Sequence, residues 1–195
     1  MKIVKITFFL FLLFQNISIA KNKVIIIATV NNSIITNFDL EKEIHFIEIV
    51  NTSANIDKLN IKKIAKENLI NDEIKYQEIK QNKNKITDEK LLNEYLNIFI
   101  KNTKINLETT NDSIKELIKK KIFIDVNWNN LINQKFAWKI NINMDEINKK
   151  ITNDNSEESL KIKKNLINIE KQKKMKVFSN YYFNLVKNKS LIKTL

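Results

Sequence analysis

The chain has 195 residues, with 34 basic residues, 22 acidic residues and one histidine, and its formal net charge is +12. It contains no Gly, Pro or Cys, which excludes glycine-rich phosphate-binding loops, disulfides and cysteine-based metal sites. The single histidine also excludes the paired histidines of a helical zinc site. The length is typical of one domain with a moderate core.

The first twenty residues have the order of a secretory signal peptide. Lys2 and Lys5 form a positive start, an apolar run follows over residues 6–14, and residues 18–20 (Ser-Ile-Ala) have the small side chains of a cleavage site. The alternative is an uncleaved membrane anchor, but the stretch before Lys21 is shorter than the roughly 20 apolar residues of a membrane-spanning helix. We therefore expect cleavage, a periplasmic mature chain and no transmembrane segment after cleavage.

The positive charge does not favour nucleic acid as a partner. The sequence has no arginine, so the bidentate contacts that arginine makes to phosphate and guanine are excluded. The lysines are interspersed with acidic residues, and an exported protein meets little nucleic acid. We expect no nucleic-acid binding. We favour a solvated lysine-rich surface without a partner, and the alternative is an electrostatic attraction to acidic clients or anionic lipid surfaces.

The chain then begins with a predicted β-hairpin. Val24–Val30 is a β-branched run, Asn31-Asn32 supplies the turn, and a second apolar run ends at Thr36. Thr36 is a good N-cap, and Asp39 three residues later completes an arrangement like a capping box. A helix is expected from there to about Val50.

The rest of the chain is predicted to be helical. Apolar residues at helical spacing follow one another in several segments, separated by polar stretches. Leu191-Ile192-Lys193 at the end is apolar enough to dock on the domain. The predicted elements are helices over 59–80, 87–100, 111–121 and 127–141, a short turn over 144–151, a polar linker over 152–159, and the longest helix over 160–188.

No active site is apparent. His45 lies on the first helix without a nucleophile pattern around it, so we interpret it as a surface or structural residue. The adjacent carboxylate pairs, such as Asp88-Glu89 and Asp145-Glu146, suit helix starts better than acid catalysis. We expect no cofactor, no metal site and no catalytic residue. The aromatic residues Trp128, Phe136 and Trp138 are more typical of a core than of a binding platform.

The order of these segments resembles the N-terminal domain of the SurA family of periplasmic chaperones. Val24–Leu40 resembles its first hairpin and helix, and Leu69–Glu73 with the following Gln-Glu resembles its "L-I-D-E-x-L-x-x-Q-E" helix. Ile86–Glu89 resembles the "V-S-D-E-E" that opens the next helix. Trp128–Ile140 resembles the last core helix, and Met144–Ile147 resembles a second "V-S-D-E-V" start.

The resemblance implies a helical bundle with a short N-terminal hairpin, onto which a long C-terminal helix folds back. The domain would comprise residues 21–151, completed by the helix of 160–195, whose Phe178, Tyr182 and Leu185 we expect to be buried. Family members usually carry parvulin-type prolyl isomerase domains before the final helix. Such a domain needs on the order of 100 residues, and only the linker of 152–159 occupies that place here.

The function that the resemblance implies is an ATP-independent holdase for unfolded outer-membrane proteins or extended, aromatic-rich peptides. We expect no prolyl isomerase activity, and hence no acceleration of a proline-limited refolding reaction. Two alternatives stay open: a non-catalytic accessory subunit of a cell-envelope assembly complex, and residual isomerase activity. The candidate client-binding side chains are Tyr95, Phe99, Trp128, Phe136 and Trp138.

Overall fold

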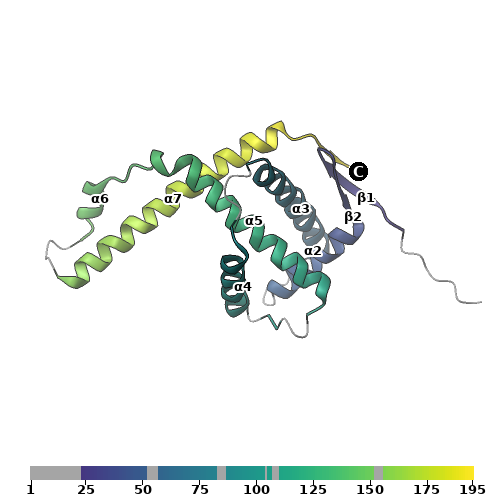
Figure 1. Ribbon diagram of the computed structural model, residues 1–195, viewed down its shortest axis with the longest axis horizontal. Coiled ribbons are helices and arrows are strands. Elements are labelled where there is room, and N and C mark those ends of the chain that lie inside the picture. Colours follow the sequence, from purple (N-terminus) through teal and green to yellow (C-terminus); the bar gives the residue numbers. More distant parts are fainter. Residues whose placement is uncertain (1–22, 52–56, 83–86, 104, 107–109, 152–155) are drawn as a thin grey trace, which may run out of the picture.

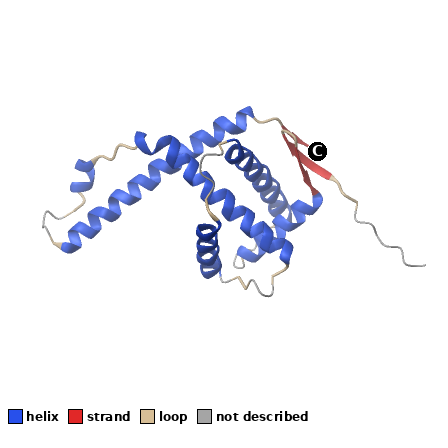
Figure 2. Ribbon diagram, in the orientation of Figure 1, coloured by secondary structure: helices blue, strands red, loops and turns tan. Residues whose placement is uncertain are grey.

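The computed structural model describes residues 23–51, 57–82, 87–103, 105–106, 110–151 and 156–195 (Figure 1). This part of the chain is mainly helical, with one small antiparallel sheet at the edge of the helices (Figure 2). The expected fold class, a helical bundle with a short hairpin and a long C-terminal helix, is confirmed. The predicted signal peptide lies outside the described residues.

The sheet contains the predicted hairpin and one further strand. β1 (Ile26–Val30) and β2 (Ser33–Thr36) pair antiparallel, and Asn31 at their turn has the positive φ of 53° that asparagine tolerates. The sequence predicted only that the C-terminal tail docks. The tail forms β3 (Ile192–Thr194), which pairs antiparallel with the other edge of β1. The strand order is therefore β2-β1-β3, and the C-terminal end closes onto the N-terminal hairpin.

The predicted capping box sets the start of α2 (Asn37–Val50). The backbone N–H of Asp39 donates to Thr36 Oγ1 at 3.3 Å, and the backbone N–H of Thr36 donates to Asp39 Oδ2 at 2.8 Å. These bonds fix the direction in which the chain leaves β2, and α2 packs against α3 (Lys58–Gln81). The core between these two helices consists of Ile47, Ile61 and Ala65.

The prediction of two helices over 111–121 and 127–141 is wrong. α5 (Asp112–Phe136) is one continuous helix, followed by a single 3-10 turn, η3 (Ala137–Lys139). The polar residue Asn127 is buried inside α5. Its amide donates to Phe123 O at 2.8 Å and accepts from the backbone N–H of Thr87 at 2.7 Å. Asn127 therefore attaches the segment before α4 (Glu89–Thr103) to α5 and does not end a helix.

The longest helix, α7 (Glu157–Lys189), begins earlier than predicted. Ser156 is its N-cap, so Glu157, Glu158 and Ser159 are helical and the linker is shorter than 152–159. Its residues 152–155 lie outside the described residues. The N-terminal half of α7 extends away from the bundle beside α6 (Met144–Asn148), as Figure 1 shows on the left. We call this part, residues 137–151 and 156–170, the arm.

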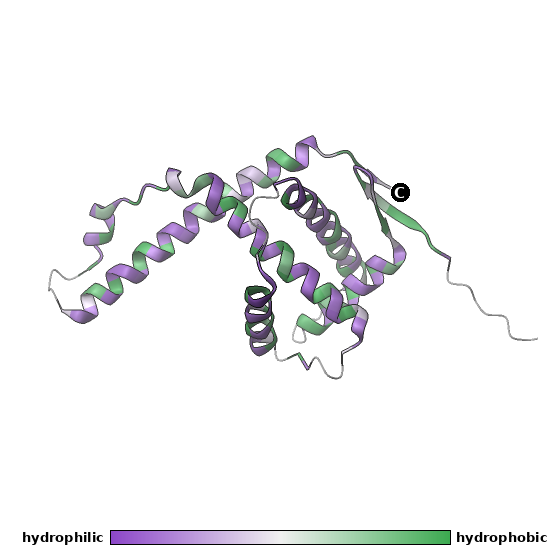
Figure 3. Ribbon diagram, viewed as in Figure 1, coloured by the Kyte–Doolittle hydropathy of each residue, from purple (hydrophilic) through white to green (hydrophobic). Residues whose placement is uncertain are grey.

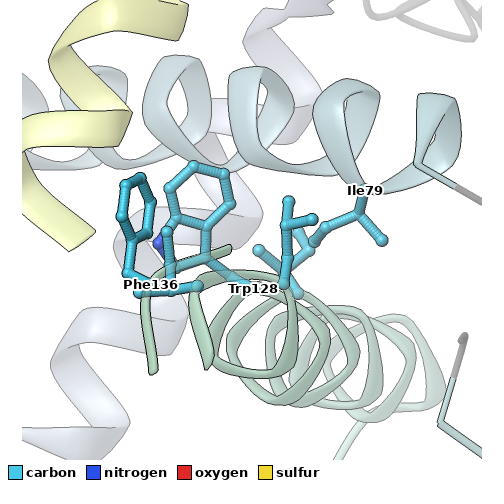
Figure 4. Packing of buried hydrophobic residues seen from close by; sticks show 6 residues of the cluster. Ile79, Trp128 and Phe136 are labelled. Carbon is cyan, nitrogen blue, oxygen red and sulfur yellow. The ribbon is translucent and has the colours of Figure 1, made fainter. Parts of the chain in front are cut away.

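The C-terminal half of α7 crosses α5 and α3 and closes the central core. Phe136 of α5 stacks on Phe178 with 5.1 Å between ring centroids, and Trp128 lies 5.8 Å from the ring of Tyr182. Phe178 and Tyr182 are half-buried, in accord with the prediction for this helix, whereas Leu185 is exposed, so its predicted burial is wrong. The buried members of this cluster (Figure 4) are Ile79, Ile124, Trp128, Leu131, Ile132 and Phe136.

Candidate functional site

The five predicted client-binding residues do not form one surface. Trp128 and Phe136 are buried in the central core, as the alternative interpretation of the aromatic residues anticipated. The indole N–H of Trp128 donates to Ser179 Oγ at 2.9 Å, so its polar group is also used inside the protein. Neither side chain is free to contact a ligand unless α7 moves away.

The other three residues lie at two separate places. Phe99 is half-buried on α4 and stacks on Phe46 of α2 with 6.3 Å between ring centroids, while Tyr95 is exposed one turn away. Trp138 belongs to the arm and is 77% exposed, with Lys139 Nζ 5.0 Å from its ring centroid. Trp128 and Trp138 lie only ten residues apart in sequence, but only Trp138 is exposed enough to contact a ligand.

A groove lies between the C-terminal part of α5 and the middle of α7. Its volume is about 500 Å³, which accommodates several residues of an extended chain. Four carboxamide side chains line it, together with two lysines and an apolar floor. The lining residues are Asn129, Ile132, Asn133, Asn168, Lys171, Gln172, Met175, Lys176 and Ser179.

The chemistry of this groove suits a peptide backbone. Each carboxamide has two N–H donors and an acceptor oxygen, which match the C=O and N–H groups of an extended chain. Asn133 and Gln172 are exposed, and their side-chain amides hydrogen-bond to none of the described residues. Met175 provides a flexible apolar surface that adapts to different side chains. This lining is suited to contacts with a peptide backbone, and the hydroxyl of Ser179 at its floor accepts the hydrogen bond from the indole N–H of Trp128.

The groove was not predicted from the sequence. Asparagine occurs throughout the chain, so Asn129 and Asn133 do not stand out locally. The two helices that supply the lining meet only because α7 folds back over α5. The only sequence signal for the groove was a spacing of four residues between amide side chains. This spacing places Asn129 and Asn133 on one face of their helix, and it does the same for Asn168 and Gln172.

A second group of polar side chains is buried between α2, α3 and α5. Glu43 of α2 is fully buried, and Lys121 Nζ of α5 lies 2.9 Å from its Oε2. The same ammonium group lies 2.7 Å from Asp72 Oδ2, and the amide of Asn68 donates to Glu43 Oε1 at 3.0 Å. An adjacent pocket of about 250 Å³ is lined in part by Phe99. Because these polar groups are already paired with one another, we interpret the cluster as an attachment between three helices.

The environment of this cluster shifts two pKa values. Burial raises the pKa of Glu43, against the lowering effect of Lys121 and Asn68. The pKa of Lys121 is also raised: burial lowers it, and the charges of Asp72 and Glu43 outweigh burial. The ammonium group therefore stays charged at neutral pH, and the Glu43 carboxyl takes up a proton more readily in the folded protein than in the unfolded chain.

The raised pKa of Glu43 predicts that the stability difference between the natural protein and the variant Glu43→Gln depends on pH. Between the raised folded pKa and the unfolded value of 4.5, the folded state binds more protons at Glu43, so its contribution to the free energy of unfolding increases as pH falls. We expect the stability of the natural protein to rise relative to Glu43→Gln as pH is lowered through this window. Urea unfolding at a series of pH values measures the difference, and a difference that falls with acidification contradicts the assignment.

The described residues contain no group of three or more His, Cys, Asp and Glu side chains that could hold a metal ion. His45, which was predicted to be a surface or structural residue, has an exposed side chain on α2, and its Nδ1 lies 3.9 Å from Glu48 Oε2. In the part of the chain that the structure describes, no helix is long and apolar enough to cross a membrane.

No protein-family model matches the chain, and no curated protein sequence is significantly similar to it. The resemblance to the SurA N-terminal domain therefore depends on the sequence motifs and their order.

Proposed function

We propose that this protein is an ATP-independent holdase of the periplasm, which keeps unfolded outer-membrane proteins soluble by binding extended segments in the α5–α7 groove. The observation that supports this proposal best is the set of four exposed carboxamides that line a groove with an apolar floor. The order of SurA-like motifs behind a signal-peptide pattern points the same way. The proposal includes no prolyl isomerase activity and no cofactor.

The arm adds a second contact region to the proposed client path. Trp138 projects from η3, and its indole N–H donates to Lys135 O at 3.0 Å, which holds the ring at the surface. An aromatic ring in that position packs on aromatic client side chains, while the groove holds the backbone. The lysines near both places favour clients with acidic residues.

The groove is tested by the double variant Asn133→Asp and Gln172→Glu. Both changes keep the shape but replace donor amides by carboxylates, which cannot donate to peptide carbonyls. We expect affinity for an extended, aromatic-rich peptide to fall about tenfold, since two hydrogen bonds contribute on the order of 1–2 kcal/mol together. Fluorescence anisotropy of a labelled peptide measures the change.

The matched control is Asn180→Asp with Asn184→Asp, which adds the same charge to exposed positions of α7 outside the groove lining. The control should bind the peptide within about twofold of the natural protein, as expected for screened surface charges. Equal losses in both double variants would attribute the effect to net charge and would remove the groove from the proposal.

An exposed apolar stripe on α7 favours the alternative function, an accessory subunit of a larger complex. Val177, Tyr181 and Leu185 are exposed on α7 at a spacing of four residues, so they form one apolar stripe on its outer side. Such a stripe suits a fixed protein partner. A single stoichiometric complex in a pull-down, lost in Val177→Ser with Tyr181→Ser, would favour this alternative over a spectrum of weakly bound clients.

A further inference from the structure

The groove between α5 and α7 has a positively charged lining. Lys171 and Lys176 line it, and no acidic side chain does so among the described residues. Neither ammonium group forms an ion pair with an acidic side chain in the part of the chain that the structure describes. Two cations without a counter-charge, beside an apolar floor, favour a ligand that carries both negative charge and apolar surface.

The charge of the groove is not neutralised by residues nearby in the sequence. Residues 126–144, which include the α5 side of the groove, contain no Asp or Glu, and neither do residues 171–195. The acidic residue just before each stretch is engaged elsewhere. Asp125 lines the separate pocket beside the buried polar cluster, and Glu170 pairs with Lys173 at 3.0 Å. The positive lining therefore faces the space that a ligand would occupy.

The two lysines stand on either side of the polar face of α7. The other α7 residues of the lining recur at spacings of four, three and four, so they share one face of the helix. They are Asn168, Gln172, Met175 and Ser179. Lys171 and Lys176 border this face on opposite sides, about 7.5 Å apart along the helix axis at 1.5 Å per residue. Hydrophilic and hydrophobic residues alternate along α7 in Figure 3, so one helix supplies both amides and cations to the groove.

We propose that the groove selects extended segments in which a carboxylate side chain lies next to an apolar one. The carboxylate lies between Lys171 and Lys176, the apolar neighbour packs on Ile132 and Met175, and the backbone contacts the amides. Such selectivity rests on the proposed function, since the groove must be the place where clients bind. It makes Asp or Glu beside an apolar residue the preferred feature of a client segment.

The selectivity is tested with short, aromatic-rich peptides that differ only at the central residue, which is Asp, Asn or Lys. Acetylated and amidated ends leave the central side chain as the only variable charge. We expect the Asp peptide to bind about fivefold more tightly than the Asn peptide, the effect of two surface ion pairs, and the Lys peptide to bind most weakly. The preference should disappear in about 1 M salt, which screens exposed charges beyond about 3 Å. Fluorescence anisotropy with the full chain measures each affinity.

The role of the lysines is tested in the variant Lys171→Gln with Lys176→Gln. The Asp and Asn peptides should then bind equally, and the affinity for the Asn peptide should stay within about twofold of that of the natural protein. The matched control is Lys63→Gln with Lys119→Gln, which removes the same charge from exposed positions outside the groove lining. Lys119 precedes Asn129 by about 15 Å along α5, beyond a Debye length of about 8 Å. The control should keep the preference for Asp.

The outcomes separate this selectivity from the holdase itself. Equal binding of the Asp and Asn peptides, lost for both in Asn133→Asp with Gln172→Glu, would overturn the selectivity and leave the groove as the client site. No binding of any peptide would overturn both. A preference for Asp that persists in Lys171→Gln with Lys176→Gln, or that is lost equally in the control, would also contradict a carboxylate held by these two lysines. A further peptide, with central Asn and a free C-terminal carboxylate, should gain no affinity. An equal gain there would assign the lysines to chain ends and would overturn the preference for side chains.

Discussion

Lys121→Met is expected to lower the free energy of unfolding by about 3–5 kcal/mol, because it leaves a buried carboxylate without its partner. Glu43 is fully buried, and Lys121 is the only basic group within 4.0 Å of it among the described residues. Methionine has a similar length and keeps the packing of the aliphatic stem. Urea unfolding at neutral pH, followed by circular dichroism, measures the loss.

The neighbouring residue provides the control for this prediction. Lys120 also forms an ion pair, with Glu73 at 3.8 Å, but half of its side chain is exposed. Lys120→Met should therefore cost less than about 1 kcal/mol, as surface ion pairs do. Similar losses for the two substitutions would show that the Glu43 carboxylate does not depend on Lys121.

Removal of the C-terminal helix is expected to have the largest effect on the fold. Deleting residues 160–195 uncovers Trp128 and Phe136 and removes β3 from the sheet. Each large apolar side chain that loses its cover contributes about 1.5–3 kcal/mol, so the total approaches the 5–15 kcal/mol stability of a typical domain. We expect the truncated chain to aggregate, which light scattering and the loss of a cooperative thermal transition would detect.

A shorter deletion separates the helix from the strand. Removing residues 191–195 alone eliminates β3 and leaves α7 over the core, so a folded monomer with reduced stability is expected. If the chain ending at residue 159 stayed monomeric and unfolded at the same temperature as the full chain, α7 would not close the core.

The helices were predictable because their local signals agreed. Thr36 with Asp39 set the start of α2, and apolar spacing set the inner faces of α3 and α7. The error over α5 concerns a residue whose role depends on a distant partner. The polar residue Asn127 favoured the prediction of a break between two helices. Its hydrogen-bond partner Thr87 precedes it by 40 residues, so the sequence around Asn127 does not distinguish a buried polar contact from a helix end.

The site was less predictable than the fold. Trp128 and Trp138 lie only ten residues apart in sequence, but α7 and α3 pack over the first and leave the second exposed. Glu43 looks like a surface residue of an amphipathic helix until Lys121, from another helix, is placed beside it. The groove is formed by pairs of amides on two helices that are distant in sequence, and local patterns do not reveal such pairs.

The central claim is that this chain alone holds unfolded polypeptides, and the aggregation of a denatured outer-membrane β-barrel protein after dilution tests it most directly. The assay compares dilution with and without the chain of residues 21–195, in the absence of ATP. We predict suppression of light scattering near stoichiometric ratios, with more than one client, and weaker suppression by Asn133→Asp with Gln172→Glu. Unchanged aggregation in the presence of folded, soluble protein would contradict the holdase proposal and favour the accessory-subunit alternative.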